Sequence, residues 1–273
     1  MEPIDGCHRV RACLIVVFVL EVASNAAHAA EENRQTSAEE AAEKSTQPFF
    51  DTNTLQLQPS YTDVRDGGSA IQVLLRLSVA YKGLWIPGLK LWDVYSIARL
   101  EMYGEGLIKP TSPNVAGLQD WNALLLGVKP FQWGAQVGLG VYAVLPTATD
   151  SALGTQEFQL GPAFGAMVTH VRHLQIGALV EFFFSTAGAV AGLASAQVQP
   201  IIVYHLPKAF YFETNGIMKF DFNQSPHSTV PVNLHFGRGL TKHLVLTAIV
   251  EGVTTGSGVG NVTVQVNLNY LGW

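Results

Sequence analysis

The residues best able to do chemistry in this chain are its histidines. His170 and His173 stand three positions apart, which on a helix would be the spacing of metal ligands, but they lie between two segments that read as strands. The remaining histidines are scattered, and both cysteines fall within the first 13 residues. We therefore interpret the histidines as interfacial or lumenal side chains and expect no metal and no cofactor.

A membrane-embedded hydrolase would need a serine, a histidine and a carboxylate within reach of one another. Ser60, His235, His243 and Glu251 could supply these groups, but no motif joins them. The patterns G-x-S-x-G, H-E-x-x-H and the P-loop are absent from the sequence. We predict no catalytic residue, and a lipid-modifying membrane enzyme remains a less favoured alternative.

A set of polar side chains, each alternating with apolar neighbours, is the stronger functional lead. If the alternating segments form a barrel, these side chains face its interior. They either pair with one another and fill the barrel, or they line a path that carries charges of both signs. The predicted lumen-lining residues are Arg76, Glu157, Gln159, Gln197, Gln199, Glu213, Lys219, Asp221, His235, Glu251 and Gln265.

Strands must position these side chains, because from Thr52 onward the hydrophobic pattern has a period of two. The clearest segments are Ile71–Lys82, Phe210–Phe222 and Val262–Leu271, which run from ten to thirteen residues. A tilted transmembrane strand needs about 9–11 residues, whereas strands of soluble proteins usually have about 5–6. Strand length therefore favours a membrane barrel over its main rival, a soluble β-sandwich in the periplasm.

The whole pattern predicts an all-β protein, an antiparallel up-and-down transmembrane β-barrel of about twelve strands. Short and long connections alternate along the chain, and an even strand number places both termini in the periplasm. A transmembrane helix within Phe182–Pro207, which lacks Lys, Arg, Asp and Glu, is disfavoured by the glutamines and proline inside it. The expected strands are 53–62, 69–82, 92–104, 118–128, 132–145, 155–169, 173–185, 194–205, 209–222, 229–237, 243–253 and 261–271.

The amino-terminal residues predict the compartment. Arg9 and Arg11 precede the apolar run Cys13–Leu20, and Ala27-His28-Ala29 ends the segment, which is the order of a secretory signal peptide. We expect a signal peptide over 1–29, a polar acidic linker over 30–51 that is disordered or partly helical, and the barrel over 52–273. Cleavage leaves 14 basic and 18 acidic residues, a net charge of −4, so a nucleic-acid partner is not expected.

Several motifs resemble a family of bacterial outer-membrane barrels, the MetA-pathway of phenol degradation family of transporters. They are Leu145-Pro146-Thr147-Ala148-Thr149-Asp150, Leu160-Gly161-Pro162-Ala163 and Gln197-Val198-Gln199-Pro200 with Tyr204-His205-Leu206-Pro207. The resemblance implies a barrel that passes small molecules, apolar ones included, and it carries no catalytic residues. Within the first motif we predict Pro146, Thr147, Thr149 and Asp150 as loop or gate residues.

The leading hypothesis is an outer-membrane channel or transporter for passive or facilitated passage of small solutes. A closed structural or adhesive barrel is the second hypothesis. The expected partners are outer-membrane lipid, a small-molecule solute and the machinery that inserts barrels. The terminal aromatic Trp273 is typical of chains which that machinery recognises.

Overall fold

The computed structural model describes residues 35–46, 49, 52–64, 68–86, 89–109, 113–171, 173–187, 194–222, 227–256 and 261–272. The predicted signal peptide lies outside this part of the chain. Apart from one helix at 35–45, the described elements are all β-strands. None of the described helical residues forms a segment long and apolar enough to cross a bilayer.

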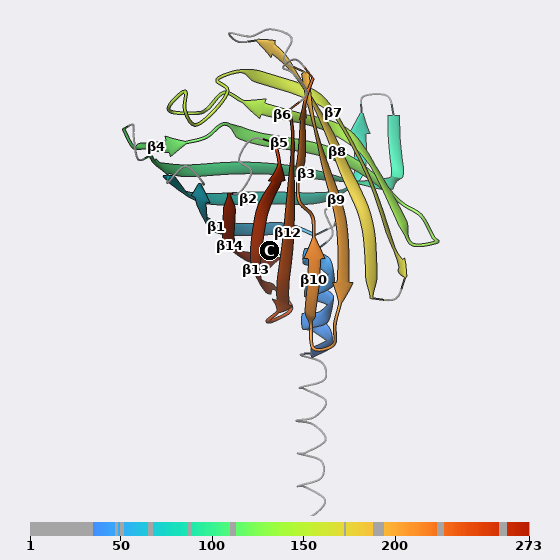
Figure 1. Cartoon of the computed structure of the whole chain (residues 1–273). Helices are drawn as coiled ribbons and strands as arrows, with labels where there is room; N and C mark the ends of the chain where they lie inside the picture. The colour runs from blue at the N-terminus through green and yellow to red at the C-terminus, as the bar shows by residue number, and fades with distance from the viewer. Residues whose placement is uncertain are drawn as a thin grey trace, which may run out of the picture.

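The described strands form one antiparallel sheet that closes on itself, because the first strand pairs with the last (Figure 1). Two barrel strands are interrupted, so the strand segments occupy twelve positions around the ring. The segments are β1 Thr54–Val64, β2 Gly68–Ile86, β3 Leu89–Ile108, β4 Val115–Leu118, β5 Trp121–Pro130, β6 Ala135–Leu145, β7 Phe158–Val171, β8 Leu174–Ala187, β9 Ala194–His205, β10 Phe210–Thr214, β11 Met218–Asp221, β12 His227–Gly239, β13 Leu244–Thr255 and β14 Val262–Leu271.

The predicted barrel and its strand number are confirmed, with each expected strand found close to its expected bounds. The disfavoured helix within Phe182–Pro207 is instead the end of β8 and all of β9. Short connections at 206–209 and 240–243 lie at one end of the barrel, together with the start of β1 and the end of β14. Longer ones such as 146–157 lie at the other end, which we call the loop end.

The two interruptions were not predicted, and at each one a side chain accepts hydrogen bonds from backbone amides. Between β4 and β5, Asp120 Oδ1 accepts a hydrogen bond from Ala148 N at 3.0 Å, and its Oδ2 accepts one from Thr155 N at 2.7 Å. Between β10 and β11, Asn233 Oδ1 accepts a bond from Asn215 N at 2.9 Å. The Asp120 carboxylate thus satisfies two backbone N–H groups of the 146–157 loop, and the Asn233 amide oxygen satisfies one at the break itself.

The outward faces of the strands are apolar, as a lipid-facing surface requires. Leu139 on β6 and Val232 on β12 are each 61% exposed, and the inward neighbours of Val232 are the proline and asparagine at 231 and 233. The exposed outward side chains include Leu55, Leu57, Val137, Val141, Leu160, Phe164, Ile176, Ile202, Leu234, Phe236, Val250, Val264 and Val266.

The interior of the barrel is uneven. From β5 to β8 it is filled by buried apolar side chains, among them Leu126, Tyr142, Met167 and Phe183. Tyr142 and Phe183 pack edge to face, with ring centroids 5.0 Å apart. Large side chains therefore fill one side of the lumen, and the inward positions of β1 and of β12 to β14 are mainly polar.

The helix at 35–45 lies inside the barrel at the end with the short connections, beside β10 in Figure 1. Ala38, Ala41 and Ala42 are buried, at the i, i+3, i+4 spacing that places them on one helix face. The small side chains permit a close approach: a Cβ added at Gly239 on β12 would lie 2.1 Å from the Ala38 carbonyl oxygen. The amide of Lys208, in the turn after β9, donates to Glu39 Oε1 at 3.1 Å.

Residues 46 and 49 continue this packing towards the opposite wall. Thr46 Oγ1 donates to Gln175 Oε1 on β8 at 3.3 Å, and the carbonyl of Phe49 accepts a hydrogen bond from the Tyr95 hydroxyl on β3. The Phe49 ring is fully buried against Gly165 on β7. We name residues 35–46 and 49 the amino-terminal plug. Residues 35–45 of the predicted linker form this helix, and the sequence alone left open whether the linker enters the lumen.

Candidate functional site

The interior holds a cavity of about 570 Å³ on the side away from the apolar filling. Its walls are side chains from β1, β2, β3 and the strands from β9 to β14. Its floor is the end of the amino-terminal plug, where Lys44, Ser45 and Thr46 face the cavity. A cavity of this size lies within the range of pockets that hold small organic ligands.

Seven of the eleven predicted lumen residues line this cavity: Arg76, Gln199, Glu213, Lys219, His235, Glu251 and Gln265. Glu157 and Gln159 are buried near the loop end of β7 instead. Gln197 and Asp221 share the inward phase of Gln199 and Lys219 on β9 and β11, but they do not contribute to the cavity. The period of two therefore predicts which face of each of these strands points into the lumen. A role of these residues in passage remains a proposal.

The predicted gate residues lie at the loop end and do not line the cavity. Thr147 Oγ1 accepts a hydrogen bond from Trp121 N at 2.9 Å, and Thr149 Oγ1 accepts one from Leu118 N at 3.0 Å. Asp150 Oδ1 accepts one from Ala152 N at 2.8 Å, within the loop, and Pro146 is exposed. These contacts hold the loop against β4 and β5.

A chain of four charged side chains crosses the lumen, and three of its members were not predicted. Arg76 Nε lies 2.7 Å from Glu101 Oε1, and Arg99 Nε lies 3.2 Å from the same oxygen. Arg99 Nη2 then reaches Glu181 Oε1 at 3.3 Å. Because β5, β6 and β7 separate β3 from β8 in the sheet, the contact between Arg99 and Glu181 spans the interior. We call these four residues the charged bridge.

The sequence did contain a signal for the charged bridge. Arg99 and Glu101 are two positions apart, so in a strand they share a face. Glu181 is the only charged residue between Leu174 and Ala187, a segment that is otherwise largely apolar. A charge at such a buried position needs a partner of opposite sign, so Glu181 signals a buried ion pair without identifying Arg99 as the partner.

A row of carboxamides follows β1 and β14. Arg76 Nη1 donates to Gln56 Oε1 at 3.0 Å, and Gln56 Nε2 donates to Gln58 Oε1 at 2.7 Å. Gln58 Nε2 in turn donates to Gln265 Oε1. Asn267 and Asn269 continue the row on β14 towards the plug. We call Gln56, Gln58, Gln265, Asn267 and Asn269 the amide row, and all five line the cavity.

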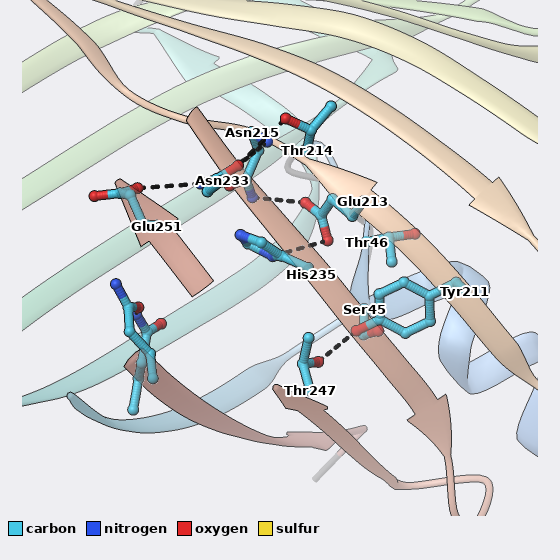
Figure 2. Close-up of polar contacts among 12 residues, drawn as sticks. Ser45, Thr46, Tyr211, Glu213, Thr214, Asn215, Asn233, His235, Thr247 and Glu251 are labelled. Atoms are coloured by element: carbon cyan, nitrogen blue, oxygen red, sulfur yellow. Dashed lines mark hydrogen bonds and ion pairs between the residues drawn. The ribbon is translucent and has the colours of Figure 1, made fainter. Parts of the chain in front are cut away.

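A second polar cluster lies on β10, β12 and β13, and Figure 2 shows that its side chains face one another. Glu213 Oε2 lies 3.6 Å from His235 Nδ1, and Glu213 Oε1 accepts a hydrogen bond from Asn215 Nδ2 at 2.6 Å. Asn233 Nδ2 donates to Asn215 Oδ1 at 3.1 Å and to Glu251 Oε2 at 3.2 Å. These bonds fix the orientation of both carboxylates towards the cavity.

The residues considered for hydrolysis are not brought together. Ser60 lies on β1 and His235 on β12, with β13 and β14 between these strands in the sheet. Ser60 Oγ donates to the Gln72 carbonyl at 3.4 Å. His243 Nδ1 contacts the Leu271 carbonyl at 2.7 Å, near the end of the barrel with the short connections and the plug, which we call the plug end. Within the described ranges, no group of three or more His, Cys, Asp or Glu residues could hold a metal ion.

No protein-family model matches this sequence, and no curated protein matches it either. Solved structures do match the fold. The COG4313 outer membrane channel from Pseudomonas putida F1 aligns with a TM-score of 0.63 at 10% identity, over 81% of this chain and 94% of that one. The NanC porin aligns at 0.56 and 11% identity over 79% and 98% of the two chains, and the KdgM porin at 0.50 and 10% over 80% and 98%. At such identities the likeness shows the barrel fold that these outer-membrane proteins share.

Proposed function

We propose that this chain is an outer-membrane channel whose lumen passes small molecules by passive or facilitated diffusion. The observation that carries the proposal is a cavity lined by polar side chains of both charge signs, inside a closed barrel with an apolar exterior. Polar groups are costly to bury unless they contact water, solute or one another. A cavity lined in this way therefore suits a hydrated path.

The uneven interior favours a channel over a closed structural barrel. A barrel that serves only as a structure would gain stability from a filled interior throughout, as the region from β5 to β8 illustrates. Along β1 and from β12 to β14 the chain instead keeps glutamine, asparagine and threonine facing an open space. The apolar solutes that the family resemblance implies receive no specific support from this lining.

The amino-terminal plug gives the proposed channel a narrow floor. It contacts β3, β7, β8 and β12, so it spans much of the lumen at the plug end. Passage through the whole barrel therefore requires the plug to shift, or the solute to pass beside Lys44 and Thr46, which face the cavity. We propose that the plug end faces the periplasm, as the predicted signal peptide and linker require.

Reconstitution of the chain from residue 30 into planar bilayers and liposomes tests the proposal. We expect discrete conductance steps and entry of small polar solutes. Heat-modifiable gel mobility provides the control for folding, and membrane fractionation tests the location. A folded, heat-modifiable barrel that conducts no ions and admits no solute of any class would refute the channel and favour the structural barrel.

A further inference from the structure

We propose that the cavity binds a neutral, polyhydroxylated solute, such as an uncharged sugar, between the amide row and the pair formed by Glu213 and His235. The inference names a solute class for the channel proposed above and rests on that function. Four features of the described residues support it: the charge balance of the walls, the donor and acceptor pattern, an unsatisfied histidine nitrogen and the apolar patches between the polar groups.

The charges around the cavity are of both signs and nearly balance. Four cations line it, namely Lys44, Arg76, Arg99 and Lys219. Glu213 and Glu251 line it as well, and Glu101 and Glu181 sit directly against the two arginines. Lys44 pairs with Glu40 within the plug, so Lys44, Arg76 and Arg99 each have a carboxylate partner. The other charged groups of the lining are Lys219, Glu213 and Glu251. A strongly anionic or cationic solute would have to compete with these pairs, so the walls favour a solute without net charge.

The amide row forms an uncharged wall of the cavity, and its groups both donate and accept hydrogen bonds. Each carboxamide of the amide row offers an acceptor oxygen and two N–H donors. A hydroxyl group also both donates and accepts, so it can bond to a carboxamide in either sense. An apolar solute can make no hydrogen bond to these groups. It would displace the water bound to them and leave their donors and acceptors unsatisfied.

One cavity nitrogen lacks a partner among the described residues. His235 is only 7% exposed and lines the cavity, and its Nδ1 faces Glu213 (Figure 2). Its Nε2 makes no hydrogen bond in the described part of the chain. A buried polar atom in this state gains most from a ligand group that bonds to it. A solute hydroxyl would supply that bond in either histidine tautomer.

Apolar side chains alternate with these polar groups around the cavity. Ile249 stands between Thr247 and Glu251 on the inward face of β13, and Ile217 stands between Asn215 and Lys219. A sugar ring presents C–H faces between its hydroxyl groups. The mixed lining therefore matches a compact polyol better than a chain of charged groups.

Binding to the folded full-length mature chain in detergent micelles tests the inference, with sucrose as the neutral probe. Glucuronate and galactosamine serve as charged probes, and toluene as the apolar one. We expect sucrose to bind more tightly than the other three. Tighter binding of any of them would overturn the inference, as would a protein that conducts ions but does not bind sucrose. Absence of conductance from the folded protein would instead refute the channel itself.

Substitutions at His235 locate the site. His235→Leu should weaken sucrose binding about three- to tenfold, because one hydrogen bond is lost. His235→Gln, which keeps a donor and an acceptor, should restore most of the affinity. Leu234→Ile, at the adjacent lipid-facing position, is the matched control and should leave binding unchanged. Equal affinity in the leucine and glutamine variants, with heat-modifiable mobility retained, would exclude His235 from the site.

Discussion

The charged bridge should contribute strongly to the stability of the barrel through Arg99. This side chain is 12% exposed and lies between Glu101 and Glu181, whose side chains are 5% and 8% exposed. In Arg99→Met, Glu101 keeps Arg76 at 2.7 Å, but Glu181 loses the one ion pair found for it within the described residues. Removal of one partner from a buried pair costs about 3–5 kcal/mol, because the other charge stays buried and uncompensated.

A double substitution separates the cost of the orphaned charge from that of lost packing. In Arg99→Met with Glu181→Leu, no carboxylate is left unpaired, since Glu101 still contacts Arg76. We expect this variant to recover about 2 kcal/mol or more of the loss, as replacement of a buried pair by apolar groups is often close to neutral. Reversible urea unfolding in phospholipid vesicles, followed by tryptophan fluorescence, measures both free energies of unfolding.

Two results would refute this reasoning. The first is a free energy of unfolding for Arg99→Met within about 0.5 kcal/mol of the parent, as for an exposed ion pair. The second is a double variant whose loss equals the sum of the two single losses, because additivity means that the residues do not interact. Arg99→Lys is the matched control: it keeps the charge but not the planar fork, so its loss should be intermediate.

Three further predictions concern the lipid face, the plug and the break between β10 and β11. Leu139→Arg, at a lipid-facing position in the middle of β6, should lower the free energy of unfolding in vesicles by about 2–4 kcal/mol. Gly165→Ala would place a Cβ 2.0 Å from Phe49 Cζ, so it should displace the plug and raise the single-channel conductance. Gly104→Ala is the matched control and should leave the conductance unchanged, because a Cβ there meets nothing within 4 Å. Asn233→Ala leaves Asn215 N and Glu251 without their partner and should cost about 1–3 kcal/mol in urea unfolding.

The strands and their faces could be predicted because one physical rule governs both. Lipid on one side and a polar lumen on the other impose a strict period of two, which is why Arg76, Glu213 and Gln265 were assigned inward and do line the cavity. The neighbours around the ring then follow from antiparallel pairing of consecutive strands. To predict the number of strands, it was enough to locate the turns between the periodic segments.

What the sequence could not give is which inward side chains meet across the lumen. The contact between Arg99 and Glu181 joins residues 82 positions apart on strands that are not neighbours, so no local pattern encodes it. For a related reason, the sequence left open whether the linker enters the lumen as a plug. In the sequence, the plug alanines lie among charged and polar residues, so the segment has the pattern of a linker. In the structure, Gly165 and Gly239 leave room for Phe49 and Ala38 and so show where the segment packs.

The position of the plug also bears on the order in which the protein folds. Thr46 contacts Gln175 on β8, 129 positions away, and Glu39 contacts Lys208 in the turn after β9, 169 positions away. Contacts of such long sequence separation form late, since the chain between them must first be ordered. The plug, which comes first in the described sequence, is therefore among the last parts of the protein to reach its native position. Its docking requires β3, β7, β8 and β12 to be in place around the lumen.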